Sequence, residues 1–230
     1  MWAYAYLLAR ALGYQAEING VPGFKNTFKP ITGVCAKGPV IEITEGDDQI
    51  WTEDFDATVK RVQDSQSMVT IHGFMEQSRY YIPHRDHLRD VLQPDLKYPD
   101  SNEVAVHIRK AGVRKHTQWE QSPWFVQRDY YTRALDVTGH ENAVIYTDDI
   151  NSAADYDLGL PIKSGEPLED FARIMAARAI ILNKSTFSWW AAFLSNASKI
   201  IQPEPLSTWR CKDNIHVYLG VPTWIKLSIP

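Results

Sequence analysis

The stretch of sequence that decides the fold is residues 179–194, which read AIILNKSTFSWWAAFL. Four apolar residues are followed by a short polar turn and then by a second apolar run. This order predicts a buried strand that passes through the turn directly into a helix. The first N–H groups of a helix have no partner within it and favour anions. Ser185 and Thr186 therefore either cap this helix or help to hold a phosphate group.

The same alternation of strand and helix runs through the second half of the chain. Short apolar strands are expected at residues 103–109, 143–147, 179–182 and 199–202. Helices are expected at residues 128–138, 167–178 and 185–196. Strands that alternate with helices predict a parallel sheet covered by helices on both faces. Ligands of such sheets bind beyond the carboxyl ends of the strands, so these ends are the candidate site.

The first hundred residues are less regular, because glycines and prolines interrupt residues 20–39. The expected elements are an opening helix closed by Gly13, strands at 16–19, 40–44 and 68–74, and helices at 55–64 and 85–92. A polar turn at residues 98–102 then precedes the regular half. We therefore expect two domains, residues 1–100 and 101–230.

Composition excludes several classes of protein. The 230 residues carry 24 Lys and Arg against 28 Asp and Glu, a net charge of -4, which argues against nucleic acid as a partner. The two cysteines form no metal or disulfide framework, and no apolar run reaches the roughly 20 residues of a transmembrane segment. The motifs of dinucleotide-binding oxidoreductases, P-loop NTPases and α/β-hydrolases are absent.

Positive charge gathers at the end of the strand 103–109. The guanidinium fork of Arg109 suits phosphate oxygens, and Lys110 follows it. His107 lies two residues earlier and so faces the same side of the sheet. The cluster is either a phosphate site or a solvated loop with a structural histidine.

Carboxylates follow the next strand. Asp148 and Asp149 come directly after residues 143–147 and can hold a metal ion, although aspartates at strand ends also form turns. Carboxylates can also act as general bases, and Asp148, Asp149 and Glu76 are the candidates, among which the residues leave the choice open.

Two further pairs of side chains allow a functional and a structural interpretation. Trp189 and Trp190 can stack on a sugar, but on a helix packed against a sheet they more often belong to the core. His84 and His87, with Asp86, resemble a metal cluster that lacks another ligand nearby in the sequence.

Five segments, in the same order, resemble the α-1,2-fucosyltransferases. VAVHIRK (104–110) is similar to their HxRRxD segment, IYTDDI (145–150) to their aromatic-Ser-Asp-Asp segment, and NKSTFSWWAAFL (183–194) to NSTFSWWAAWL. WAYAYLLARALG (2–13) resembles their Asn-Gln-Met-Phe-Gln-Tyr-Ala helix, and GFMEQSRYY (73–81) their Gly-Tyr-aromatic-Gln-Ser-x-x-Tyr-Phe segment. The resemblance covers nearly the whole chain.

The resemblance implies a GT-B-like α/β fold, with two Rossmann-like halves and a cleft between them. It implies an inverting glycosyltransferase that moves fucose from GDP-fucose to a hydroxyl of a glycan acceptor, with no obligatory metal ion and no other cofactor. The first half is then the acceptor side, and the second half binds GDP-fucose. By position, Arg109 matches the arginine that binds the diphosphate, and His107 and Asp170 match residues near the nucleoside. The segment near the phosphates contains Ser185, Thr186 and Ser188.

The sequence departs from the family pattern in three places. Lys110 replaces the second arginine, Gly112 stands where the motif has an aspartate, and the glycine-rich turn of the family would lie before Met1. We therefore expect a truncated first half that lacks a strand, and weak activity.

Two other functions remain open at this stage. One is transfer of another sugar from a GDP-linked donor, and the other is a non-catalytic nucleotide-binding remnant of the family. The resemblance places the chain in the cytoplasm of a bacterial cell or a viral host, in glycan biosynthesis. Peripheral association with a membrane is compatible with the sequence.

Overall fold

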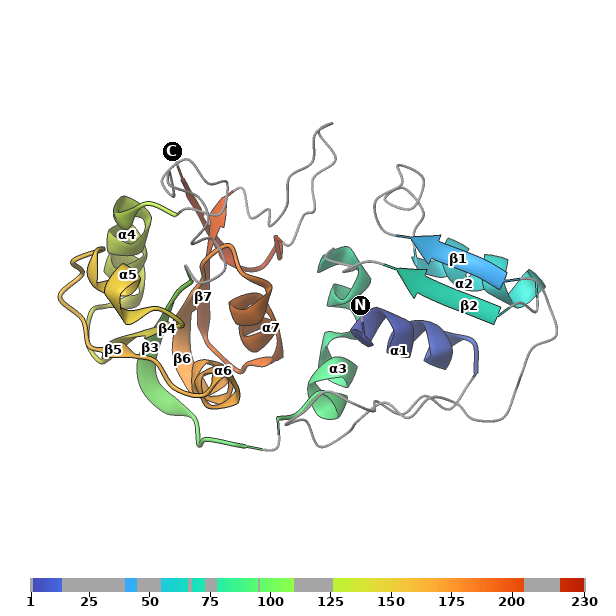
Figure 1. The fold of residues 1–230 in the computed structure, drawn as a ribbon, viewed down its shortest axis with the longest axis horizontal. Helices are drawn as coiled ribbons and strands as arrows, with labels where there is room; N and C mark the ends of the chain where they lie inside the picture. Colours follow the sequence, from blue (N-terminus) through green and yellow to red (C-terminus); the bar gives the residue numbers. More distant parts are fainter. Residues whose placement is uncertain are drawn as a thin grey trace. The chain divides into compact units, whose positions relative to one another are not determined.

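The computed structural model describes residues 2–13, 40–44, 55–65, 68–72, 78–94, 96–109, 126–204 and 220–229. These residues fall into two compact units (Figure 1). The first lies within Met1–Gln93, and the second begins at Pro94. Each unit is described by itself.

The first unit combines a pair of parallel strands with short helices. Its elements are α1 (Trp2–Ala11), β1 (Val40–Thr44), α2 (Phe55–Ser65), β2 (Met68–His72), η1 (Ser78–Tyr80), η2 (Ile82–His84) and α3 (Arg85–Val91). The strands pair in parallel, with Val40 opposite Met68. The buried Tyr4 ring of α1 packs edge-on against the rings of Phe55 and Tyr80, with centroids 5.4 and 5.1 Å away. These aromatic contacts join α1 to α2 and η1.

The second unit is an α/β structure built on one parallel sheet. Its strands are β3 (Ser101–Ile108), β4 (Ala143–Thr147), β5 (Ile162–Lys163), β6 (Ala177–Ile181), β7 (Lys199–Glu204) and β8 (Ile225–Ser228). Its helices are α4 (Arg128–Thr138), α5 (Ile150–Ala154), α6 (Pro167–Ala176) and α7 (Thr186–Leu194). The six strands lie in the order β5-β4-β3-β6-β7-β8, and every neighbouring pair is parallel.

This strand order is that of a Rossmann-like sheet. From β3 the chain adds β4 and then β5 on one side, and it returns to add β6, β7 and β8 on the other. The direction of winding therefore reverses between β3 and β6. A crevice forms beyond the carboxyl ends of the strands at such a reversal, and ligands of open α/β sheets bind there.

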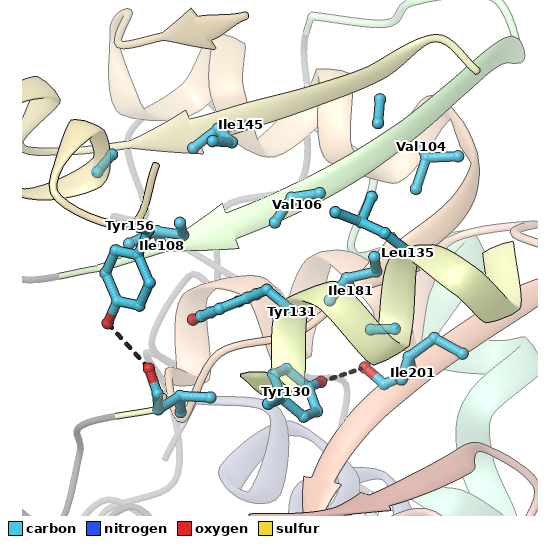
Figure 2. Packing of buried hydrophobic residues seen from close by; sticks show 14 of the residues in the cluster. Val104, Val106, Ile108, Tyr130, Tyr131, Leu135, Ile145, Tyr156, Ile181 and Ile201 are labelled. Atoms are coloured by element: carbon cyan, nitrogen blue, oxygen red, sulfur yellow. Dashed lines mark hydrogen bonds between the residues drawn. The ribbon is translucent and has the colours of Figure 1, made fainter. Parts of the chain in front are cut away.

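One face of the sheet packs against α4 and α5 (Figures 1 and 2). The strand side chains on this face and the helix side chains that cover them form a single buried cluster, which includes Val104, Val106, Ile108, Ile145, Ile181, Ile201, Tyr130, Tyr131, Leu135 and Ala153. The buried phenols also have polar partners. Tyr130 donates a hydrogen bond to the Ile201 carbonyl at 3.2 Å, and Tyr156 donates one to the Val126 carbonyl at 3.0 Å (Figure 2).

The opposite face is covered by α6 and α7 (Figure 1). Trp189 of α7 is buried, and its ring stacks on Phe193 with centroids 4.7 Å apart. The structural interpretation of Trp189 is therefore confirmed, since a buried ring offers no platform to a sugar. Trp190 packs edge-on against Trp189 and keeps a partly exposed surface.

Most expected elements agree with the structure to within two residues at each end. The strands 40–44 and 143–147 and the helix 128–138 have the bounds predicted, and Gly139 ends that helix at a positive φ of 85°. The helix expected at 167–178 was too long, because Ala177 already pairs with Ser101 in the sheet. The Arg178 side chain donates hydrogen bonds to the carbonyls of Asn102 and Thr138, which stabilises this early start of β6.

Five elements were not expected: η1, η2, α5, β5 and β8. Each has five residues or fewer, too short for a periodic pattern. The strand expected at residues 16–19 lies outside the described residues.

The described helices are short. α2 and α4 have 11 residues each, about 16 Å at the usual rise per residue, whereas the hydrocarbon core of a bilayer is about 30 Å thick. In the part of the chain that the structure describes, no helix is long and apolar enough to cross a membrane.

Two substitutions in α4 test how the sheet and helices share one core. Leu135 is 1% exposed and belongs to the buried cluster, whereas Val137 is 38% exposed on the same helix. We expect Leu135→Ala to lower the free energy of unfolding by about 2–5 kcal/mol, because it leaves a cavity. Val137→Ala should change it by less than about 0.5 kcal/mol. Urea unfolding measures both, and equal effects would contradict this packing.

Candidate active site

A pocket of about 200 Å³ lies at the carboxyl ends of the strands in the second unit. Its lining comes from the ends of β3 and β4, the segment before α6, α6 itself and the first turn of α7. The lining residues are His107, Arg109, Tyr146, Thr147, Asp148, Gly165, Pro167, Asp170 and Phe187. The pocket thus lies where the strand order predicts a ligand.

Arg109 connects three neighbouring strand ends. It directly follows β3, its Nε lies 3.7 Å from Oδ2 of Asp148 after β4, and its Nη1 donates a hydrogen bond to Oγ of Ser185 after β6, at 3.5 Å. The side chains of Arg109 and Asp148 are 48% and 41% exposed, so water screens this ion pair and its net strength is low. An anion in the pocket could therefore replace Asp148 as the partner of Arg109 at little cost.

His107 is the buried polar group of the pocket. It is only 4% exposed, and its ring lies 5.5 Å from that of Phe187. Burial, and then the charge of Arg109, lower the pKa of His107 to about 3, so the imidazole is neutral near pH 7. Among the described residues, Nδ1 of His107 has no hydrogen-bond partner. Such a group is costly in a folded protein unless a ligand or water satisfies it.

Asp170 approaches the same pocket from α6. Its Oδ2 accepts a hydrogen bond from the backbone N–H of Gly165 at 3.1 Å. Burial raises the pKa of Asp170, and the Gly165 hydrogen bond and the Arg173 charge partly oppose this. A Cβ at Gly165 would lie 3.1 Å from Oδ1 of Asp170, so glycine permits this close approach.

Tyr146 forms part of the wall of this pocket. Its hydroxyl donates a hydrogen bond to Oε2 of Glu103 at 2.8 Å, and Nζ of Lys163 lies 3.1 Å from the other oxygen of Glu103. Burial, followed by the hydrogen bond to Glu103, raises the pKa of Tyr146 well above its usual range. The phenol therefore stays neutral, and its hydrogen bond holds the ring at the edge of the pocket.

The residues at the start of α7 have different surroundings. Ser185 is the N-cap residue, but its side chain makes no capping hydrogen bond and instead accepts one from Arg109. Thr186 is the first residue of the helix. Ser188 is fully buried, and its hydroxyl donates a hydrogen bond to the Ser185 carbonyl at 3.3 Å. Ser188 therefore holds the turn together and does not line the pocket.

The two aspartates after β4 also have different surroundings. Asp148 lines the pocket, whereas Asp149 caps α5, with its Oδ1 accepting a hydrogen bond from the Ser152 N–H at 3.2 Å. This capping contact agrees with the interpretation of Asp149 as a turn-forming residue at the strand end. Glu76 and Lys110 lie outside the described residues. Within the described ranges, no three His, Cys, Asp or Glu side chains are placed to hold a metal ion.

Five lining residues had not been singled out from the sequence: Tyr146, Thr147, Gly165, Pro167 and Phe187. Tyr146 and Thr147 immediately precede Asp148, and Phe187 follows Thr186, so proximity to the strand ends was an available signal. Gly165 lies in the irregular segment before α6, and Pro167 is the first residue of that helix. Only the folded structure shows the approach of Gly165 to Asp170.

The depressed pKa of His107 predicts a loss of stability in acid. Below about pH 6.5, the usual pKa of histidine, the unfolded chain binds a proton that the folded chain does not bind until about pH 3. Lowering the pH from 7 to 5.5 should therefore lower the free energy of unfolding of the wild type by roughly 1 kcal/mol more than that of His107→Gln. Urea unfolding at both pH values measures this, with the exposed His140→Gln as control. An unchanged pH dependence in His107→Gln would contradict the burial.

Comparison with known proteins identifies the family of the chain. Residues 44–216 match the model of glycosyl transferase family 11. The chain is also 24% identical, over 179 residues, to an alpha-1,2-colitosyltransferase of Escherichia coli, an alignment that covers 68% of this chain and 61% of that protein. The resemblance to α-1,2-fucosyltransferases is confirmed at the level of the family. The chain belongs to glycosyl transferase family 11.

Proposed function

We propose that the protein transfers fucose from GDP-fucose to a hydroxyl of a glycan acceptor, with inversion at the sugar carbon. Family membership supports glycosyl transfer. The observation that carries the donor site is that Arg109 and His107 line one pocket and that Nδ1 of His107 has no hydrogen-bond partner among the described residues. This pocket offers a cation and an unsatisfied polar group at the reversal of the strand order, where nucleotides bind in open α/β sheets.

The diphosphate is proposed to bind between Arg109 and the start of α7. When the bond between sugar and phosphate breaks, negative charge develops on the leaving β-phosphate. Arg109 can contact two phosphate oxygens at once, and the first N–H groups of α7 add partial positive charge. These groups are already held in place, so they stabilise the transition state more than the ground state.

The nucleoside is proposed to lie against His107 and Asp170. The carboxylate of Asp170 can accept hydrogen bonds from the ring N–H and amino group of guanine, and a buried carboxylate gains more from such bonds than an exposed one. Nδ1 of the neutral His107, which has no partner in the part of the chain that the structure describes, can form a hydrogen bond to the nucleoside. These two contacts would favour GDP over nucleotides whose bases lack that pair of donors.

Of the two candidate bases that the structure describes, Asp148 and Asp149, we propose Asp148 for the acceptor hydroxyl. It lines the pocket beside Arg109, whereas Asp149 is occupied by its capping hydrogen bond. In this role the carboxylate of Asp148 accepts the proton of the acceptor hydroxyl while the diphosphate contacts Arg109.

In this proposal the chain has a GT-B-like organisation. The second unit, which holds the pocket and the Rossmann-like sheet, binds the donor. The first unit contributes to the acceptor side.

A second donor has specific support. The relative from Escherichia coli is named for the transfer of colitose, and the chain spans 61% of its length. We therefore keep transfer of another GDP-linked sugar, colitose, as the alternative. Competition between the two GDP-linked sugars in one reaction would give the ratio of their kcat/KM values and so decide between them.

Replacing Arg109 tests the proposed function. Arg109→Ala should lower GDP affinity by at least about tenfold and abolish transfer, because a charge-assisted contact to the diphosphate is lost. Arg109→Lys should recover little, since an ammonium group cannot contact two oxygens in the same plane. Calorimetry with GDP and a transfer assay with GDP-fucose measure the two effects. Arg128→Gln, an exposed arginine of the same unit, is the control. Near-normal GDP affinity in Arg109→Ala would contradict the placement of the diphosphate.

Removing divalent metal ions should leave GDP affinity and transfer nearly unchanged. The proposed charge at the diphosphate comes from Arg109 and the start of α7, and Asp148 acts as a base. The measurement is the transfer rate with and without EDTA. A large loss that manganese restores would instead make Asp148 a metal ligand.

A further inference from the structure

A second pocket, of about 380 Å³, lies within the first unit and has no part in the donor site. It is formed by the last turn of α1, the first residue of α2, η2 and the start of α3. Its lining residues are Leu7, Arg10, Ala11, Phe55, Ile82, Pro83, His84, Arg85, Asp86 and His87. The volume falls within the usual range of small-molecule sites.

Positive charge dominates the lining. Arg10 and Arg85 supply the positive charge of the described lining, and His84 and His87 lie beside them. The acid among the described lining residues is Asp86, whose side chain is 94% exposed and lies 4.0 Å from Arg89. Arg10 is the one charged residue of α1 and makes no ion pair in the described part of the chain. The pocket is therefore suited to a negatively charged group.

The charges of neighbouring arginines also affect the pKa values of two lining residues, Arg85 and His87. Burial, and then the charge of Arg89, lower the pKa of Arg85. Burial, and then the charge of Arg10, lower the pKa of His87, while Asp90 opposes this. Positive groups that are partly withdrawn from water and close to each other are stabilised by a bound anion. The hydroxyl of Tyr6 lies 2.8 Å from Nε2 of His87, which fixes the direction of that ring.

The remaining lining is apolar and partly aromatic. The rings of Phe55 and His84 meet edge to face, with centroids 5.7 Å apart, and Ile82 and Pro83 lie beside them. A simple inorganic anion would leave these surfaces without a partner. A sugar ring has a C–H face that packs on such a wall, and a charged substituent would reach the arginines.

We propose that this pocket binds an acidic saccharide, with a carboxylate or phosphate ester against Arg10 and Arg85 and the sugar ring against Phe55. A guanidinium fork matches the paired oxygens of either group. The identification of this saccharide as part of the acceptor rests on the proposed function. Binding itself does not.

The test is calorimetry on the full 230-residue chain. The ligands are glucuronate and glucose 6-phosphate, with glucose, acetate and inorganic phosphate as matched ligands that lack either the charge or the ring. Each sample is also titrated with GDP. The variants are Arg10→Gln and Arg85→Gln, and Arg61→Gln is the control, because Arg61 is exposed on α2 and does not line the pocket.

At least one acidic sugar should bind about tenfold or more tightly than glucose and than its own free anion. Each pocket variant should lower that affinity by about fivefold or more, since a charge-assisted contact is lost. Arg61→Gln should not, and GDP affinity should be unchanged throughout. The preferred acidic sugar identifies the charged group as a carboxylate or a phosphate ester.

The inference would be overturned if glucose or the free anions bound as tightly as the acidic sugars. It would also be overturned if both pocket variants kept the affinity of the wild type for the acidic sugar. The absence of acidic-sugar binding in a chain that still binds GDP would overturn it as well. Acidic-sugar binding in a chain that does not bind GDP would leave this site standing and would refute the proposed donor site.

Discussion

The pairing of β3 with β6 is the constraint on which the candidate active site depends. The two strands are parallel and hold Val104 opposite Ala179 and Val106 opposite Ile181. Their carboxyl ends therefore reach the same edge of the sheet. Arg109 and Ser185 are 76 residues apart in the sequence, yet their side chains are in hydrogen-bonding contact at 3.5 Å. Without this pairing the arginine would have no helix start beside it.

The burial that stabilises β3 also sets the chemistry of its last residues. Residues 104–108 are all buried, as expected of a central parallel strand with helices on both faces. A histidine at the end of such a strand loses its contact with water, so it stays neutral, and its Nδ1 lacks a partner among the described residues. The apolar cluster on the other face of the sheet offsets this cost. The pocket is thus an exception to the rule that buried polar groups are satisfied, and such exceptions concentrate at functional sites.

The sequence predicted the second unit better than the first. Apolar strands that alternate with helices are strongly patterned, so β4 and α4 have the expected bounds, and family motifs pointed to His107, Arg109 and Asp170. The exact ends of some elements depend on tertiary contacts. The sequence pattern predicts Ala177 and Arg178 as the end of a helix, but in the structure they belong to β6, which pairs with β3. The sequence also could not predict that Asp148 and Asp149 have different surroundings, because the two residues are adjacent and chemically identical. Which one caps α5 depends on backbone geometry.

We propose that the pocket at the junction of β3 and β6 binds the donor nucleotide, and a crystal structure of the protein with GDP would show whether it does. We expect the diphosphate to lie against the guanidinium of Arg109 and the first turn of α7. Nδ1 of His107 should be hydrogen-bonded to the nucleotide, and the base should lie near Asp170. GDP bound elsewhere, with Arg109 still paired to Asp148 and Nδ1 of His107 still without a partner, would contradict this proposal.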